Sequence, residues 1–154
     1  MKHVANPLPD IHINQEWRVG IVAATFYKEE IDALIASAKS FLVQAGLPEA
    51  NITVHHVPGS FEIPLIGSAL AEMHKVDALI GIGIIVQGET FHANLLAAEV
   101  ARGIMEVQLQ FGIPFAFEVL WVNKLAEAQA RLNKGEEAAK AVLQSLAELA
   151  RIES

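Results

Sequence analysis

The sequence contains no cysteine among its 154 residues. Disulfide bonds are therefore excluded, and so is any chemistry that depends on a thiolate. A cysteine-free chain gives no sign of an oxidising compartment, where disulfides form and persist. We therefore expect the protein in a reducing cytoplasm.

Long apolar runs and an excess of basic residues are also missing. No stretch approaches the roughly 18 uninterrupted apolar residues that a membrane helix needs, and the N-terminus lacks the apolar run of a signal peptide. The chain has 11 Lys and Arg against 18 Asp and Glu, which gives a formal net charge of −7. Binding to a phosphate backbone requires clustered positive charge, so we expect neither nucleic acid nor a membrane as a partner.

Hydrophobic residues, by contrast, are abundant. They make up 53% of the chain, which exceeds the roughly 45–50% that is usual in globular proteins. The length predicts one domain that spans residues 1–154, and the apolar surplus indicates further surface buried between subunits. We therefore expect an oligomer.

Strand and helix patterns alternate along the chain after an irregular N-terminal arm, residues 1–16. Short runs rich in Val and Ile predict strands, and apolar residues at three- and four-residue spacing predict helices. The predicted strands cover 17–24, 51–57, 77–86 and 114–122, and the predicted helices cover 28–45, 64–74, 92 or 94 to 111, 126–132 and 136–152. This alternation predicts a doubly wound α/β domain with a parallel sheet covered on both faces.

Ligands of open α/β sheets bind beyond the carboxyl ends of the strands, and four segments meet that condition. The first is Phe26 at the end of a predicted strand. Its ring either stacks on a flat heterocycle or fills the core, and the second role is the commoner one. The second segment is PGSFEIP, residues 58–64, in which the glycine permits tight backbone geometry. Ser60, Phe61 and Glu62 there either contact a ligand or form a strand-to-helix turn.

The third segment is GETFH, residues 88–92, between a buried strand and a helix. Backbone N–H groups of Gly88, Glu89 and Thr90 ahead of a helix N-terminus would bind phosphate without a positive side chain. His92 beside such a site would be suited to proton transfer, because imidazole titrates near neutral pH. The alternative is that Thr90 caps the helix and His92 is an ordinary surface residue.

The fourth segment is AEAQARLNKGEEAA, residues 126–139. Arg131 and Lys134 would complete a phosphate site as a planar fork and a point charge, and Gly135 would allow the turn that brings them inward. Alternatively, both belong to the solvated face of a terminal helix. The other histidines show no metal-ligand spacing with a carboxylate cluster, so no metal site is predicted.

The runs PGSFEIP and GIGIIVQGETFH, followed by AQARLNKGEEAA, resemble the lumazine synthase family of riboflavin biosynthesis. The resemblance extends from about residue 19 to residue 149. It implies a transferase that condenses 5-amino-6-(D-ribitylamino)uracil with 3,4-dihydroxy-2-butanone 4-phosphate to 6,7-dimethyl-8-ribityllumazine, phosphate and water, without a cofactor. It also implies a flavodoxin-like fold, a three-layer αβα sandwich around a four-stranded parallel sheet, with an extended N-terminal arm.

The same resemblance assigns roles to individual residues. His92 matches the proposed proton donor, and Phe26 matches the aromatic residue that stacks on the pyrimidine. Contacts with the pyrimidine and its ribityl chain are implied for Ser60, Phe61, Glu62, Ile84, Ile85, Val86 and Phe117. Contacts with the phosphate are implied for Glu89, Thr90, Arg131 and Lys134.

The chain departs from the usual family pattern around these motifs. Gln87 stands where an arginine is usual, and Ala93 and Asn94 replace the aromatic and acidic residues that commonly follow the histidine. Residues 121–123, WVN, replace a threonine-rich turn, and the segment between Arg131 and Asn133 is much shorter than in most bacterial members. These changes fall on the loops around the expected site, so they bear on its geometry more than on the class of reaction.

Members of the family form pentamers, and many pack twelve pentamers into a 60-subunit icosahedral shell with the active site between adjacent subunits. The resemblance therefore implies a homo-oligomer and leaves pentamer, decamer and shell open. The N-terminal arm could pair with the sheet of a neighbouring subunit. Two other functions fit the same fold, because fold alone does not fix function: a catalytically inactive oligomeric scaffold and a binding protein for a phosphorylated ligand.

Overall fold

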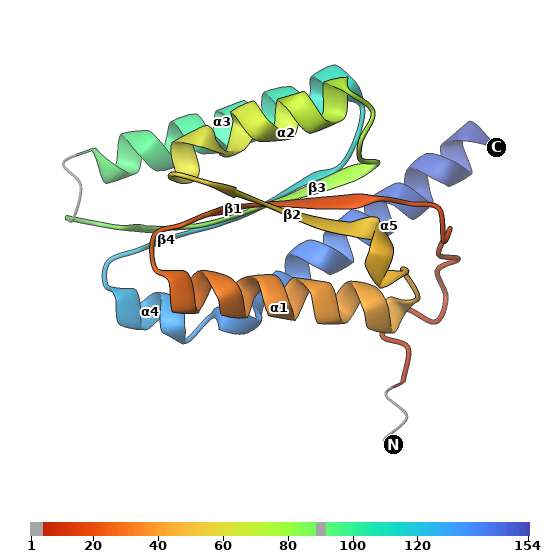
Figure 1. Cartoon of the computed structure of the whole chain (residues 1–154), viewed down its shortest axis with the longest axis horizontal. Coiled ribbons are helices and arrows are strands. Elements are labelled where there is room, and N and C mark those ends of the chain that lie inside the picture. Colours follow the sequence, from red (N-terminus) through yellow and green to blue (C-terminus); the bar gives the residue numbers. More distant parts are fainter. Residues whose placement is uncertain (1–4, 89–91) are drawn as a thin grey trace.

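The computed structural model describes residues 5–88 and 92–154 and has three layers (Figure 1). The middle layer is a parallel sheet in the order β2-β1-β3-β4. Its strands are β1 (Val19–Ala24), β2 (Ile52–Val57), β3 (Ala78–Val86) and β4 (Phe115–Val122). The predicted sandwich around a four-stranded parallel sheet is therefore confirmed.

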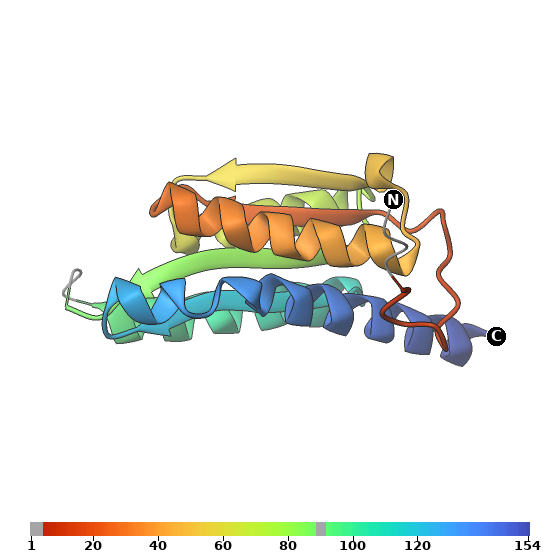
Figure 2. The same cartoon turned by 90° about the horizontal axis from the view of Figure 1, so that it is seen from below.

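Helices cover both faces of this sheet. On one face lie α1 (Lys28–Ala45), α4 (Leu125–Gln129) and α5 (Gly135–Glu153), and on the other lie α2 (Ile63–Glu72) and α3 (Ala93–Phe111) (Figures 1 and 2). Short 3-10 turns complete the chain: η1 (Glu49–Asn51), η2 (Ser60–Glu62) and η3 (Leu132–Lys134). The helix predicted over 126–132 ends earlier than expected, because the chain tightens into η3 before α5 begins.

Burial along the strands explains why their sequences differ. Every residue of β1 and β3 is buried, as expected for central strands of a sheet with helices on both faces. The edge strands β2 and β4 contain exposed and half-buried positions. One hydrophobic core joins the sheet to α1 and α5 through residues such as Leu34 and Leu143, and a second joins it to α2 and α3 through residues such as Ile63 and Ile104.

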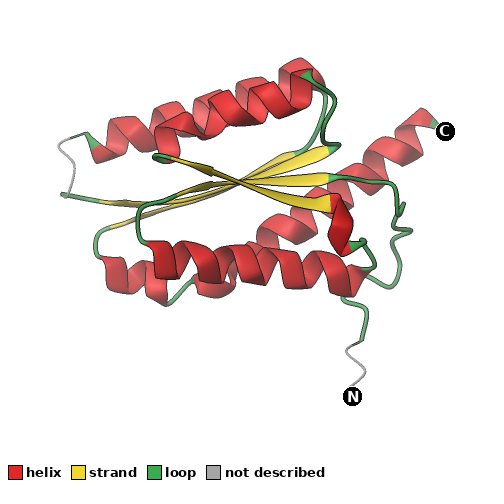
Figure 3. Ribbon diagram, viewed as in Figure 1, coloured by secondary structure: helices red, strands yellow, loops and turns green. Residues whose placement is uncertain are grey.

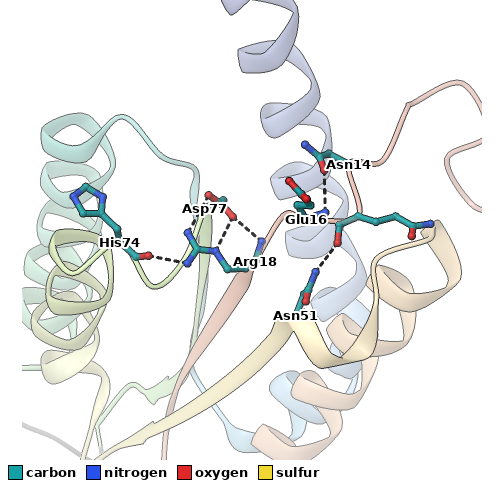
Figure 4. Close-up of polar contacts among 7 residues, drawn as sticks. Asn14, Glu16, Arg18, Asn51, His74 and Asp77 are labelled. Carbon is teal, nitrogen blue, oxygen red and sulfur yellow. Dashed lines mark hydrogen bonds and ion pairs between the residues drawn. The ribbon is translucent and has the colours of Figure 1, made fainter.

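The part of the N-terminal arm that the structure describes, residues 5–16, forms neither helix nor strand. Leu8 is nevertheless buried in the core beneath α1 and α5, and Ile11 and Ile13 pack against that core. The side-chain amide of Asn51 donates a hydrogen bond of 2.6 Å to the carbonyl oxygen of Gln15 (Figure 4). In the single chain, the arm is thus held against its own domain.

The amino-terminal edge of the sheet is closed by a polar cluster (Figure 4). The backbone N–H of Arg18 donates to Asp77 Oδ2 at 2.8 Å, and the Arg18 guanidinium lies 3.2 Å from the same oxygen. Arg18 Nη1 also donates to the carbonyl oxygen of His74 at 2.7 Å. These contacts join the starts of β1 and β3, whereas the carboxyl ends of all four strands lie at the opposite edge of the sheet (Figure 3).

Candidate active site

A cavity of about 260 Å³ opens at the carboxyl edge of the sheet, where the ends of β1 and β3 meet the segment before α2. Six residues expected to contact the pyrimidine line it: Phe26, Ser60, Phe61, Ile84, Ile85 and Val86. Three segments far apart in the sequence therefore converge as the rule for parallel sheets requires. The lining also includes Ala24, Tyr27, Gly59 and Leu96, which sequence reasoning did not assign to ligand contacts.

Two aromatic rings are presented at this cavity instead of being buried in the core. Phe26 is 66% exposed and Phe61 is 64% exposed. An exposed phenylalanine carries an energetic cost that a core residue does not, since its apolar area stays in water until something covers it. The Phe26 ring therefore does not fill the core, and it lies at the cavity instead.

Glu62 lies next to this aromatic surface, although it is not part of the cavity lining. A Cβ atom placed on Gly59 would lie 3.7 Å from Cε2 of Phe26 and 3.6 Å from Oε1 of Glu62. Gly59 thus separates a ring edge from a carboxylate, and its missing side chain leaves the space between them open. A ligand stacked on Phe26 would have a hydrogen-bond acceptor close by.

Ser60 forms part of the cavity floor and is 6% exposed. The β3 residue opposite it is Gly83, and a Cβ atom at that position would lie 2.3 Å from Ser60 Oγ. The absence of a side chain at Gly83 therefore makes room for the serine against the strand. This close approach explains why β3 tolerates a glycine in its fully buried interior.

His92 is the N-cap residue of α3 and is exposed to solvent. Its carbonyl oxygen accepts a hydrogen bond of 2.8 Å from the backbone N–H of Leu96, one turn later, and Leu96 lines the cavity. The first turn of α3 therefore borders the candidate site. Glu89 and Thr90, which the sequence suggests for the phosphate cradle, lie outside the described residues, and Gly88 before them has a left-handed backbone with φ of 87°.

Three other predicted residues lie away from this cavity. Phe117 is in the middle of the edge strand β4, in register with Gly81, and is 45% exposed. Arg131 is exposed at the start of η3. Lys134 forms an ion pair of 2.8 Å with Glu137 at the start of α5. Within one chain, the structure therefore brings together the residues expected around the pyrimidine, apart from Glu62 and Phe117, at one cavity. Arg131 and Lys134, which are expected at the phosphate, do not line it.

Trp121 and Gln87, both departures from the usual family pattern, contact each other. The indole Nε1 of Trp121 donates a hydrogen bond of 2.8 Å to Gln87 Oε1. The backbone N–H of Gln87 also donates to the carbonyl oxygen of Val122 at 2.7 Å. The end of β3 is thereby fastened to the end of β4 immediately before Gly88. Two substitutions that look unrelated in the sequence form one interaction in space.

Glu118 is a charged residue that sequence reasoning did not single out. It lies half-buried on β4, and burial raises the pKa of its carboxyl to about 7. The carboxylate of Glu137 contributes to this rise in pKa, whereas the ammonium of Lys134 opposes it. No periodic pattern in the sequence marks Glu118, because Glu137 and Lys134 come close to it only in the folded chain. Its raised pKa is therefore evident from the structure alone.

Over residues 5–88 and 92–154, no group of three or more His, Asp or Glu side chains is arranged to hold a metal ion. None of the helices in these same ranges combines the length and hydropathy needed to cross a bilayer.

Comparison with known proteins places this architecture in a family. A model described as 6,7-dimethyl-8-ribityllumazine synthase matches residues 16–150. The chain belongs to the lumazine synthase family. Its flavodoxin-like arrangement of a four-stranded parallel sheet between two helical layers agrees with that assignment.

Individual relatives of the family cover most of the chain. A protein of Stenotrophomonas maltophilia strain K279a is 38% identical over 140 residues, which is 88% of this chain and 90% of that protein. A protein of Polaromonas sp. strain JS666 is 37% identical over 131 residues, which is 84% of this chain and 85% of its own length. Both are named 6,7-dimethyl-8-ribityllumazine synthase. The similarity is thus spread over the domain and is not confined to one motif.

Proposed function

We propose that this lumazine synthase family member condenses 5-amino-6-(D-ribitylamino)uracil with 3,4-dihydroxy-2-butanone 4-phosphate to form 6,7-dimethyl-8-ribityllumazine. The observation that carries the proposal is the cavity at the carboxyl edge of the sheet, which six of the residues expected around the pyrimidine line together. An inactive scaffold would have no need of two exposed rings beside a recessed serine and a carboxylate.

The proposed chemistry demands orientation and proton transfer more than a reactive nucleophile. The 5-amino group attacks the ketone, and loss of a first water gives an imine. Elimination of phosphate and ring closure by the ribityl-bearing nitrogen, with loss of a second water, complete the product. Stacking on Phe26 would hold the pyrimidine flat, and Ser60 and Glu62 would orient its polar edge and ribityl chain.

His92 is the proposed proton-transfer group. Its position at the N-cap of α3, one turn before the cavity-lining Leu96, supports this role. Imidazole can donate to the departing phosphate and accept from the attacking amine near neutral pH. Replacing His92 by alanine is expected to lower kcat by roughly 10²-fold. Full turnover of that variant at saturating substrates would contradict the role.

We further propose that a neighbouring subunit supplies the phosphate-binding cations and Phe117. Arg131 and Phe117 are exposed and lie away from the cavity of their own chain, which supports a contribution to another subunit's site. Apolar side chains such as Leu65, at 66% exposed, and Leu109, at 73%, also suggest surface that association would cover. A pentamer, free or assembled into a 60-subunit shell, would supply these contacts through a repeated heterologous interface.

One experiment tests both the reaction and the shared site. The wild-type protein is mixed with the two substrates, and product is followed by its absorbance and fluorescence. Phe26→Ala and Arg131→Ala variants, each expected to be nearly inactive, are then unfolded, mixed and refolded together. If the two halves come from different subunits, about a quarter of the sites in a random equal mixture contain both native residues.

The outcomes separate the alternatives. Wild-type turnover at the uncatalysed background rate would refute the enzyme and favour a scaffold. Tight binding of the butanone phosphate without turnover would favour a binding protein for phosphorylated ligands. Wild-type activity without recovery in the mixture would refute the shared site alone. Arg151→Ala is the matched control for Arg131→Ala, because Arg151 is an exposed arginine on α5 whose ion pair is with Glu148.

A further inference from the structure

The backbone of Tyr27 adopts a conformation that aromatic residues rarely take. Its φ of 60° and ψ of 57° lie in the left-handed region, where a side chain crowds its own backbone. Among the described residues, His74 with φ of 53° is the other non-glycine residue with a positive φ. Tyr27 lines the candidate active-site cavity, whereas His74 lies at the opposite edge of the sheet. Strained residues of this kind tend to occur at functional sites.

The left-handed residue turns the chain abruptly from strand to helix. β1 ends at Ala24 and α1 begins at Lys28, with Tyr27 as its N-cap residue. The carbonyl oxygen of Tyr27 accepts a hydrogen bond of 2.9 Å from the backbone N–H of Ile31, so the residue is held in the first turn of the helix. Its half-buried side chain packs against the core beneath α1.

This turn gives two adjacent aromatic residues different environments. The Tyr27 side chain packs against the core, whereas Phe26 is 66% exposed and its ring edge lies beside Gly59. On the other side of Phe26, Thr25 Oγ1 donates a hydrogen bond of 3.1 Å to the carbonyl oxygen of Pro58. Phe26 therefore lies between two neighbours that are each anchored by contacts of their own.

We propose that Tyr27 is a positioning residue whose left-handed backbone presents the Phe26 ring to the pyrimidine substrate. The inference rests on the proposed function and extends it, because it assigns the orientation of the stacking ring to a residue that does not itself stack. Stacking requires the ring plane and the reacting amine to be placed together, and a shift of about 1 Å in a bound group can cost up to roughly 10²-fold in rate.

A pair of substitutions separates the backbone from the side chain. Tyr27→Asn and Tyr27→Val both remove the ring and the hydroxyl, but asparagine tolerates the left-handed region and β-branched valine does not. We expect the KM for the pyrimidine to be about tenfold higher in Tyr27→Val than in Tyr27→Asn. The KM for the butanone phosphate should agree within about twofold between the two variants, because it binds elsewhere in the site.

The matched control is the same pair of changes at His74. His74→Val should lower Tm relative to His74→Asn, since it strains a similar backbone, yet neither variant should change the KM for the pyrimidine. Tyr27→Ala is the second variant if Tyr27→Val does not fold, because alanine also disfavours the left-handed region and is not branched. It too should bind the pyrimidine more weakly than Tyr27→Asn.

Binding of an unreactive 5-nitro analogue of the pyrimidine, measured by titration, provides a readout that does not depend on turnover. A higher Kd for the valine or alanine variant than for Tyr27→Asn supports the proposal. Equal KM and Kd values in an active protein overturn it and leave the proposed function intact. A wild-type protein that neither turns over nor binds the analogue overturns the proposed function and this inference together.

Discussion

Replacing Glu118 by glutamine should stabilise the protein above neutral pH and have little effect at pH 5. Glu118 lies half-buried on β4, where burial is the main cause that raises the pKa of its carboxyl to about 7. The carboxylate of Glu137 acts in the same direction, and the Lys134 ammonium opposes both. At pH 8 the folded protein must therefore keep an unfavourable charge that glutamine would remove.

The magnitude follows from the pKa shift. The carboxyl rises from its ordinary pKa of 4.5 to about 7, so between these values the folded protein binds more protons than the unfolded chain. The penalty is absent below pH 4.5, grows as the pH rises, and is complete above pH 7. The full shift corresponds to about 3 kcal/mol, and because solvent screens a partly exposed group, we expect about 1–2 kcal/mol.

Urea unfolding at fixed protomer concentration measures this difference. The free energy of unfolding of Glu118→Gln should exceed that of the wild type by about 1–2 kcal/mol at pH 8, and the two should converge toward pH 5. Glu153→Gln, at the exposed end of α5, is the control, and its free energy of unfolding should equal that of the wild type at both pH 8 and pH 5. A Glu118→Gln difference that does not change with pH would refute the argument.

Two further predictions concern packing and hydrogen bonding. In Gly135→Ala, the new Cβ would lie 2.2 Å from the carbonyl oxygen of Leu34, so α1 and α5 must separate. The free energy of unfolding, measured in urea, should fall by about 2 kcal/mol, and an unchanged value would contradict this close contact. In Trp121→Phe, the hydrogen bond to Gln87 is lost while an aromatic ring remains. The free energy of unfolding should fall by about 1 kcal/mol in the same assay, and the same substitution should cause no loss in a protein that already carries Gln87→Met.

Much of the fold could be predicted because its signals are periodic. The central strands are uninterrupted apolar runs, since both of their faces are covered, and the long helices repeat apolar residues every three or four positions. The segment around α4 and η3 was harder to predict, because five helical residues followed by a 3-10 turn are too short to show a period. The positions of Phe26 and Ser60 followed from the topology, which gathers strand ends at one edge.

The sequence alone determined the order of the elements, the charge and the absence of thiol chemistry, because these depend on composition and on local spacing. The tertiary structure decided which side chains meet. It placed Trp121 on Gln87, gave Glu118 its raised pKa, and kept Arg131 away from the cavity that Phe26 borders. These outcomes depend on distances and burial between segments far apart in the chain. Spacing along a sequence carries no measure of such distances, whereas packing of strands and helices fixes each of them.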